Sequence, residues 1–315
     1  MKKLILKYFF CILISSLASI TLAQLPGVDN SRPDDVGTGP YPAMKEEVPS
    51  LPGHVIYRPR NLDALGSLKL GVVAWGNGGC WDDGAFNRFH LLEIASHGYL
   101  VIANGHIYSG PDAKLQPSGP LLPAGMLPPQ STNASELIDA IDWAIQENQS
   151  SDSPYFELID PNQIAVSGHS CGGVQAMTVA PDPRIKTWLI HNAGVPGDEY
   201  QFYDQYPDMA LGKENLSKIH GPIIFILGGE TDIAYRGAYD TYDYIENIPV
   251  AIASLVAAEH MGTFMEPNGG EIAQVAVHWL QWQLRGQQQD SQYFLGVNCK
   301  LCTDRAWDYK SKGVE

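Results

Sequence analysis

Short apolar runs recur along the chain, and segments with helical periodicity lie between several of them. The runs cover residues 54–59, 70–75, 99–103, 164–166, 188–190, 223–227 and 251–256. Most are four to six residues long and continuously apolar. Runs of this kind are typical of strands that are buried on both faces of a parallel sheet.

Two of the intervening segments carry apolar residues with the spacing of a helix. One follows a Ser/Thr/Asn-rich start at Ser131, and the other lies near the end of the chain. Positions i, i+3, i+4, i+7 and i+8 are Leu137, Ala140, Ile141, Ala144 and Ile145 in the first, and Ile272, Val275, Ala276, Trp279 and Leu280 in the second. Strands that alternate with helices predict an α/β protein whose mostly parallel central sheet has helices on both faces. No repeat or linker interrupts residues 53–295, so we expect one domain there.

Three segments outside this domain have different compositions. Residues 1–23 begin with lysines and continue into a short apolar run that ends in small residues, which is the pattern of a secretory signal peptide. The run is shorter than the ~20 apolar residues of a spanning helix, which favours cleavage over a membrane anchor. Residues 24–52 are rich in proline and glycine and predict an extended lead-in. Residues 296–315 form a polar tail with two cysteines.

Composition and charge exclude several classes of protein. The 315 residues include 20 Lys and Arg against 35 Asp and Glu, a formal charge of −15, and loss of the three lysines in residues 1–23 would leave −18. So acidic a chain lacks the basic surface that nucleic acid or an anionic membrane requires. With 44% apolar and 17% charged residues the chain is not intrinsically disordered. We expect a secreted or periplasmic protein with no membrane span after leader removal, and its oligomeric state stays open.

A candidate nucleophile follows the run at residues 164–166. The chain continues there as GHSCGG at residues 168–173 and then becomes compatible with a helix. A strand, a sharp turn lined with small residues and a helix together form a nucleophile elbow, which holds its serine above the turn. The pattern therefore indicates Ser170 as a nucleophile. The alternative is a tight turn whose serine only caps the helix.

A serine nucleophile needs a base that takes its proton and an acid that orients the base. In elbow-containing sheets the chain order is serine, then acid, then histidine. Asp232 follows the run at residues 223–227, and His260 follows the next run, so both lie where active sites of open parallel sheets collect. Glu230 is the competing acid. His169, beside the serine, is expected to be a packing residue.

The negative charge that develops on an attacked ester carbonyl needs two amide donors. The residue after the nucleophile, Cys171, supplies one, and Asn77 or Gly78, in the glycine-rich loop after residues 70–75, supplies the other. A plain glycine turn is the alternative for that loop. Cys80 ends the same loop, so a bridge between Cys80 and Cys171 would pin it beside the nucleophile.

Three motifs resemble the α/β-hydrolase superfamily: GHSCGG at residues 168–173, GGETD at 228–232 and EHMG at 259–262. The nearer likeness is to its branch of dienelactone hydrolases, chlorophyllases and cutinase-like polyester hydrolases. YRP at residues 57–59, WGNG at 75–78 and WLQW at 279–282 extend the likeness over about residues 53–295. The resemblance implies the α/β-hydrolase fold, a triad of Ser170, Asp232 and His260, no cofactor or metal, and hydrolysis of carboxylic esters.

Departures from the family bear on the substrate. Dienelactone hydrolases proper carry cysteine at the elbow, where this chain has Ser170. Polyester hydrolases carry tryptophan after the next strand, where this chain has His191 and Asn192, which we expect to line the pocket. A plastic-degrading role therefore has little support. Residues 197–218, rich in aromatic side chains, are either a small cap over the pocket or packing.

These patterns predict a secreted serine esterase that acts on a small-molecule or polymer-borne ester. An acyltransferase or a polyester hydrolase would use the same triad. From a different class, a non-catalytic binding protein with the hydrolase fold is the alternative. Acyl length and alcohol stay open, because loop shapes determine them.

The four cysteines after the leader, Cys80, Cys171, Cys299 and Cys302, permit three pairings. Export makes disulfides permissible. We predict the pairs Cys80–Cys171 and Cys299–Cys302, with buried reduced cysteines as the alternative. Peptide mapping by mass spectrometry without reduction should recover both pairs. Free thiols or a Cys80–Cys299 peptide would contradict the prediction.

Overall fold

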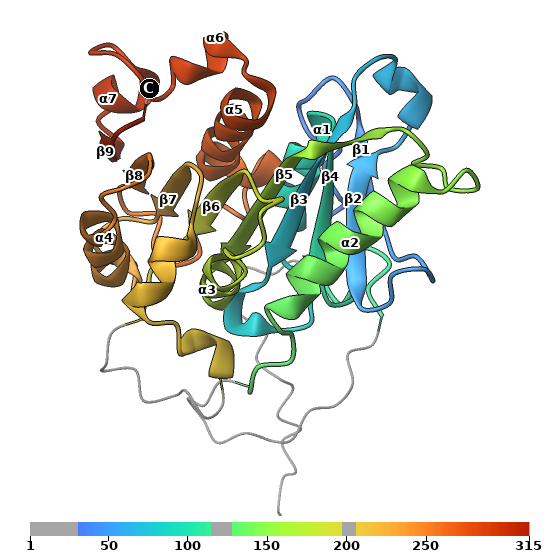
Figure 1. Ribbon diagram of the computed structural model, residues 1–315, viewed down its shortest axis with the longest axis horizontal. Helices are drawn as coiled ribbons and strands as arrows, with labels where there is room; N and C mark the ends of the chain where they lie inside the picture. The colour runs from blue at the N-terminus through green and yellow to red at the C-terminus, as the bar shows by residue number, and fades with distance from the viewer. Residues whose placement is uncertain (1–30, 115–127, 197–205, 315) are drawn as a thin grey trace, which may run out of the picture.

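The computed structural model of the chain, shown in Figure 1, describes residues 31–114, 128–196 and 206–314. A nine-stranded sheet with the order β1-β2-β4-β3-β5-β6-β7-β8-β9 forms its centre. Its strands are β1 (Ala43–Glu46), β2 (His54–Pro59), β3 (Leu70–Gly76), β4 (Tyr99–Asn104), β5 (Ile159–His169), β6 (Thr187–His191), β7 (Ile223–Leu227), β8 (Val250–Leu255) and β9 (Trp307–Lys312). The neighbours from β4 to β8 pair in parallel, whereas β1–β2, β2–β4 and β8–β9 are antiparallel. The predicted α/β class with a mostly parallel sheet is confirmed, and the predicted leader lies outside the described residues.

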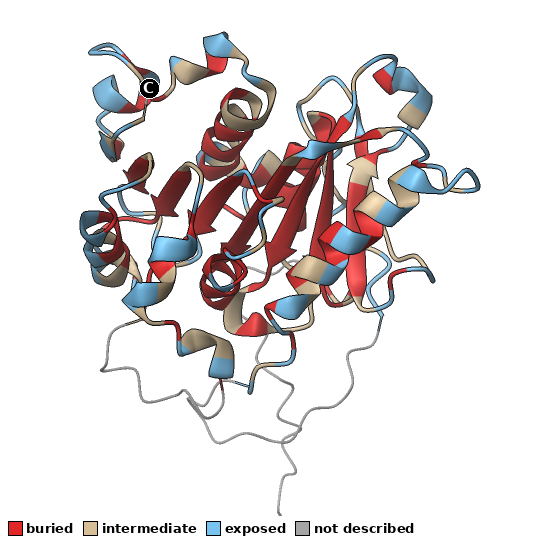
Figure 2. Ribbon diagram, viewed as in Figure 1, coloured by how far each residue is buried: buried red, intermediate tan, exposed pale blue. Residues whose placement is uncertain are grey.

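Both faces of the central strands are buried, as their continuous apolar runs predict. Alternate side chains of β3 enter two separate cores: Val72 and Ala74 on one face, Val73 and Trp75 on the other. Each of the seven predicted runs forms a strand. Figure 2 shows the strands at the centre of the sheet as the buried layer of the molecule.

Helices cover both faces of the sheet (Figure 1). The α-helices are α1 (Arg88–Ser96), α2 (Ser135–Gln149), α3 (Cys171–Thr178), α4 (Tyr235–Tyr244), α5 (Gly270–Arg285), α6 (Gln288–Ser291) and α7 (Lys300–Thr303). The 3-10 helices are η1 (Leu62–Leu65), η2 (Gly78–Cys80), η3 (Pro207–Met209), η4 (Lys213–Lys218) and η5 (Pro267–Gly269). Helices α2, α3 and α4 share one apolar core with the sheet, and α1 and α5 share the other. Within the described ranges, none of these helices has the length and apolar character to cross a bilayer.

Two helices carried no clear periodicity in the sequence. Every residue of α1 is buried, including Arg88 and Glu93, so this helix has no solvent-exposed face to create an amphipathic pattern. Helix α4 buries only Ala238, Thr241 and Tyr242, and its apolar stripe is correspondingly weak. Helix α2 begins at Ser135 rather than near Ser131. Periodicity therefore found the two long helices that have one buried and one exposed face.

The segments that flank residues 53–295 each contribute an edge strand to the sheet. Strand β1 lies within residues 24–52 and pairs with β2, while β9 lies within residues 296–315 and pairs with β8. Both strands are largely half-buried or exposed, and polar residues interrupt them. Because an edge strand has only one neighbour and a solvated side, it lacks the apolar run by which the central strands were predicted.

We expect the C-terminal tail to contribute to the stability of the domain through β9. Trp307 is buried in the core beside α5, and its indole N–H donates to Glu271 at 3.1 Å. Trp307→Ala should lower the free energy of unfolding by roughly 3 kcal/mol, because it empties a large buried site. Urea unfolding measures the change, with the exposed Arg305→Ala as a control expected to stay within about 0.5 kcal/mol of wild type. Equal stability of both variants would contradict the expected contribution of Trp307.

Candidate active site

Ser170 occupies a strained turn between β5 and α3. Its backbone has φ 53° and ψ −120°, a conformation that costs a non-glycine residue on the order of 1–3 kcal/mol. Its N–H donates to the carbonyl of His191 at 2.9 Å, and its carbonyl accepts from Gly173 N–H at 2.9 Å. The end of β6 and the first turn of α3 thus hold the strained residue in place.

Glycine is required at two positions around this turn because the backbones approach so closely. A Cβ on Gly168 would lie 2.3 Å from the carbonyl oxygen of Gly172. A Cβ on Gly172 would lie 2.0 Å from the carbonyl carbon of Gly76 at the end of β3. The small residues predicted for an elbow are therefore explained by contact of α3 with β5 and β3.

The structure brings Ser170, His260 and Asp232 together at the carboxyl ends of β5, β8 and β7. His260 Nδ1 lies 2.6 Å from Asp232 Oδ1, and its Nε2 lies 2.9 Å from Ser170 Oγ. Because a carboxylate only accepts, Nδ1 carries the hydrogen and Nε2 is left to accept from the serine hydroxyl. The competing acid Glu230 is exposed, and Asp232 alone of the two bonds to the histidine.

Asp232 is a buried carboxylate that its surroundings keep ionised. Burial raises its pKa, but hydrogen bonds from His260 and the Ala234 amide outweigh burial and hold the pKa below its ordinary value. Asn192 Nδ2 donates to the second oxygen, Oδ2, at 2.7 Å, and Gly228 N–H reaches the same oxygen at 3.3 Å. A charged, fully hydrogen-bonded Asp232 fixes the His260 ring and stabilises a positive charge on it.

The loop after β3 is tied to the first turn of α3. The Asn77 carbonyl accepts from Gly172 N–H at 3.0 Å, and the Asn77 side chain donates to the carbonyls of Trp81 and Asn104 at 2.9 and 2.7 Å. Cys171 is the first residue of α3, so its N–H has no acceptor within the helix. The backbone of Asn77 and Gly78 is thereby fixed close to Ser170, beside the positive end of the α3 dipole.

Both predicted cysteine pairs form. Cys80 and Cys171 are bridged with their Cα atoms 5.3 Å apart, and Cys299 and Cys302 are bridged with theirs 5.0 Å apart. The first bridge is buried against Tyr206 and links the loop of Asn77 directly to the residue after Ser170. The second closes a local turn at the start of α7.

A small apolar hollow opens beside Ser170 and His260. Its volume is about 70 Å³, and its described wall consists mainly of Val174, Asn192, Ala193, Gly194, Val195, Pro196, Met209, Ile233, Ala234 and Gly237. Asn192, one of the two residues expected to line the pocket, is part of this wall. Residues 197–205, the first part of the predicted cap, lie outside the described residues, while residues 206–218 contain η3 and η4.

His191 was predicted to line the pocket, and the structure places it elsewhere. It is fully buried and is not part of the described wall, with its ring 5.4 Å from Trp75 and 4.8 Å from His90, centroid to centroid. Successive residues of a strand point to opposite faces, so the last residue of β6 faces the core that contains Trp75. Asn192, one residue on, has φ 48° and turns toward Asp232.

His169 is hydrogen-bonded to the backbone of the candidate base, His260, a contact that the sequence did not predict. Its Nε2–H donates to the carbonyl of His260 at 2.8 Å, and its ring lies 5.0 Å from Phe264. Burial, together with the neighbouring His260, lowers its pKa to about 4, so the ring is neutral near pH 7. In the sequence, only the position of His169 beside Ser170 indicated a role near the site. The structure is needed to show that the His260 carbonyl accepts its hydrogen bond.

No family model matches this chain, and no curated protein matches it either. In residues 31–114, 128–196 and 206–314, no three His, Cys, Asp or Glu side chains are grouped so as to hold a metal ion. The chemistry of the site is accordingly inferred from the geometry of Ser170, His260 and Asp232.

Because of its buried histidines, we expect the protein to have a lower free energy of unfolding in acid. Burial lowers the pKa of His90 to about 3 and that of His169 to about 4, below the 6.5 of an exposed histidine. The unfolded chain therefore binds more protons than the folded one from pH 6.5 downward, and stability falls as pH is lowered toward 4. The slope is on the order of 1 kcal/mol per pH unit for each such histidine.

Urea unfolding of wild type and His90→Phe at several pH values between 7 and 4 measures this effect. The variant lacks one of the titrating groups, so wild type should lose more stability than the variant over this range. Parallel profiles for the two proteins would contradict the prediction.

Proposed function

We propose that the protein is an exported serine hydrolase of carboxylic esters with the α/β-hydrolase fold. The observation that carries the proposal is the hydrogen-bonded line from Ser170 Oγ through His260 to Asp232, with distances of 2.9 and 2.6 Å. The strained elbow and the order serine, acid, histidine along the chain support the same conclusion. The leader pattern of residues 1–23 and the two disulfides support export.

In this proposal Ser170 Oγ attacks the acyl carbon while His260 Nε2 takes its proton. Asp232 stabilises the resulting imidazolium and keeps Nδ1 protonated throughout. His260 then returns the proton to the leaving alcohol, and an acyl group remains on Ser170. Water, deprotonated by the same nitrogen, attacks the acyl-enzyme and releases the acid.

The oxyanion is stabilised by the N–H of Cys171 and by that of Asn77 or Gly78. Donors that are fixed before the reaction need no reorganisation when the charge develops, and one such donor is worth roughly 10²–10³ in rate. The Cys80–Cys171 bridge and the Asn77–Gly172 hydrogen bond supply this rigidity, because they hold the two donor segments together.

The apolar hollow is proposed to receive part of the ester beside the reacting carbon. Its walls carry mostly small or aliphatic side chains and no Lys or Arg among the described lining residues, so we expect an uncharged group there. A small-molecule ester and an ester borne on a polymer both satisfy this requirement. Acyl transfer to another alcohol would use the same acyl-enzyme.

Replacement of the nucleophile tests the function. Ser170→Ala should lower hydrolysis of p-nitrophenyl acetate by roughly 10³-fold or more while the circular dichroism spectrum is unchanged, because no other group forms the acyl-enzyme. The exposed Ser217→Ala is the matched control and should keep full turnover.

A fluorophosphonate probe gives an independent readout, since it should label wild type and Ser217→Ala but not Ser170→Ala. Unchanged turnover in Ser170→Ala would refute the assignment of the nucleophile. Absence of both turnover and labelling in wild type would instead indicate a non-catalytic binding protein.

A further inference from the structure

We propose that residues 31–39, named here the N-terminal strap, position the histidine of the candidate triad, with Arg32 and Asp35 as positioning residues. The proposal rests on the proposed function, because it concerns how His260 is held beside Ser170. Neither residue touches the triad, and both act on the His260 loop, residues 256–269, which joins β8 to α5.

The His260 loop adopts a conformation that its own residues do not favour. Ala257, Glu259 and Asn268 have φ values of 61°, 57° and 53°, in the left-handed region that disfavours residues with a side chain. Such strain persists only where surrounding groups hold the backbone. On the inner side, Glu259 N–H donates to Gly228 at 2.7 Å and Asn192 donates to the Glu259 carbonyl at 3.2 Å.

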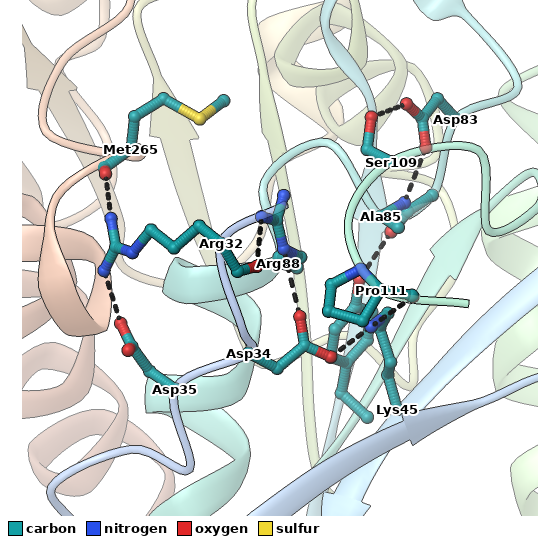
Figure 3. A network of polar contacts seen from close by, with 12 residues as sticks. Arg32, Asp34, Asp35, Lys45, Asp83, Ala85, Arg88, Ser109, Pro111 and Met265 are labelled. Carbon is teal, nitrogen blue, oxygen red and sulfur yellow. Dashed lines mark hydrogen bonds and ion pairs between the residues drawn. The ribbon is translucent and has the colours of Figure 1, made fainter. Parts of the chain in front are cut away.

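The strap holds the outer side of the loop. Arg32 Nη1 donates to the Met265 carbonyl at 2.7 Å, and its Nη2 lies 2.9 Å from Asp35 Oδ2. The same carboxylate oxygen accepts from Asn268 N–H at 2.7 Å. Arg32 and Asp35 therefore clamp the loop at two points, Met265 before η5 and the strained Asn268 within it. Figure 3 shows Arg32 between Met265 and Asp35.

The strap is itself anchored on α1 and β1, so it is a fixed support. Asp34 lies 3.0 Å from Arg88 Nε on α1 and also pairs with Lys45 on β1 (Figure 3). The Arg32 guanidinium lies over the ring of Phe89, 3.8 Å from its centroid. These three contacts hold the strap against α1 and β1, so Arg32 and Asp35 are fixed relative to the domain.

A short series of contacts connects the clamp to His260. Phe264 precedes Met265, is fully buried, and packs its ring against His169 at 5.0 Å. His169 in turn donates to the His260 carbonyl at 2.8 Å. A shift of Met265 therefore moves Phe264 and, through His169, the backbone of the base.

Loss of the clamp should affect the chemical step more than substrate binding. A base must be held to about 0.5 Å for efficient proton transfer, and a misplacement of about 1 Å costs up to about 100-fold. Apart from Ser170 and His260, the described wall of the apolar hollow comes from α3, the segment after β6, η3 and the start of α4. Arg32 and Asp35 bond instead to Met265 and Asn268. We therefore expect kcat to fall and KM to change little.

The experiment compares Arg32→Gln and Asp35→Asn with the matched control Arg58→Gln. Like Arg32, Arg58 is partly exposed and donates to one carboxylate, that of Glu46 at 2.6 Å, and to one or more backbone carbonyls. It differs in its position, because it lies on β2. With p-nitrophenyl acetate, both strap variants should lose roughly 10-fold in kcat with KM within about twofold of wild type. Arg32→Lys, which keeps a cationic donor, should recover part of the loss, and Arg58→Gln should match wild type.

Hydrogen exchange provides a readout that does not depend on catalysis. Mass spectrometry of the intact protein should show faster amide exchange in residues 261–269 for Arg32→Gln than for wild type and Arg58→Gln. Wild-type kcat in both strap variants, or an equal loss of kcat in Arg58→Gln, would overturn the proposal. If wild type hydrolysed no ester, the proposed function would fail, and unchanged exchange in Arg32→Gln would separately show that the strap does not hold the loop.

Discussion

The close backbone contact between the end of β3, the end of β5 and the first turn of α3 is the constraint on which the rest of the site depends. There is no room for a side chain at Gly168 or Gly172, and this close approach holds Ser170 in a strained turn with positive φ at the end of β5. The same contact brings the loop of Asn77 against α3, where the Cys80–Cys171 bridge secures it. One packing requirement thus places the candidate nucleophile and both candidate amide donors.

The triad region contains one buried charged group, Asp232, and buried neutral histidines, including His90 and His169. Asp232 is buried and ionised because His260, Ala234 and Asn192 all donate to it. The histidines beneath it are buried without a carboxylate partner in hydrogen-bond contact, and burial lowers the pKa of both His90 and His169. Of the histidines in this region, His260 is the one that is hydrogen-bonded to Asp232, so the carboxylate orients its ring and stabilises a positive charge on it.

The ends of the described chain support the domain from outside its predicted limits. Strand β9 closes one edge of the sheet with Trp307 packed beside α5, and β1 closes the other. The strap before β1 reaches further, because Arg32 and Asp35 meet the loop that follows His260. Segments whose composition indicated a lead-in and a tail therefore have packing roles, which follow from contacts far apart in the sequence.

The sequence by itself determined the α/β class, the seven inner strands, the two long helices and the positions of Ser170, Asp232, His260 and the cysteine pairs. The strands, the helices and the turn at Ser170 follow from local patterns, because a doubly buried strand must be apolar and a tight turn must be built from small residues. Asp232, His260 and Cys80 were expected near Ser170 because each follows a strand of the same parallel sheet. Only the tertiary structure decided that His191 faces the core, that His169 supports His260 and that Arg32 clamps the His260 loop. The contacts of His169 and Arg32 join groups that are 91 and 233 residues apart, and the ring of His191 packs on Trp75 of another strand. Such side-chain contacts depend on the exact packing of distant segments, which no local pattern encodes.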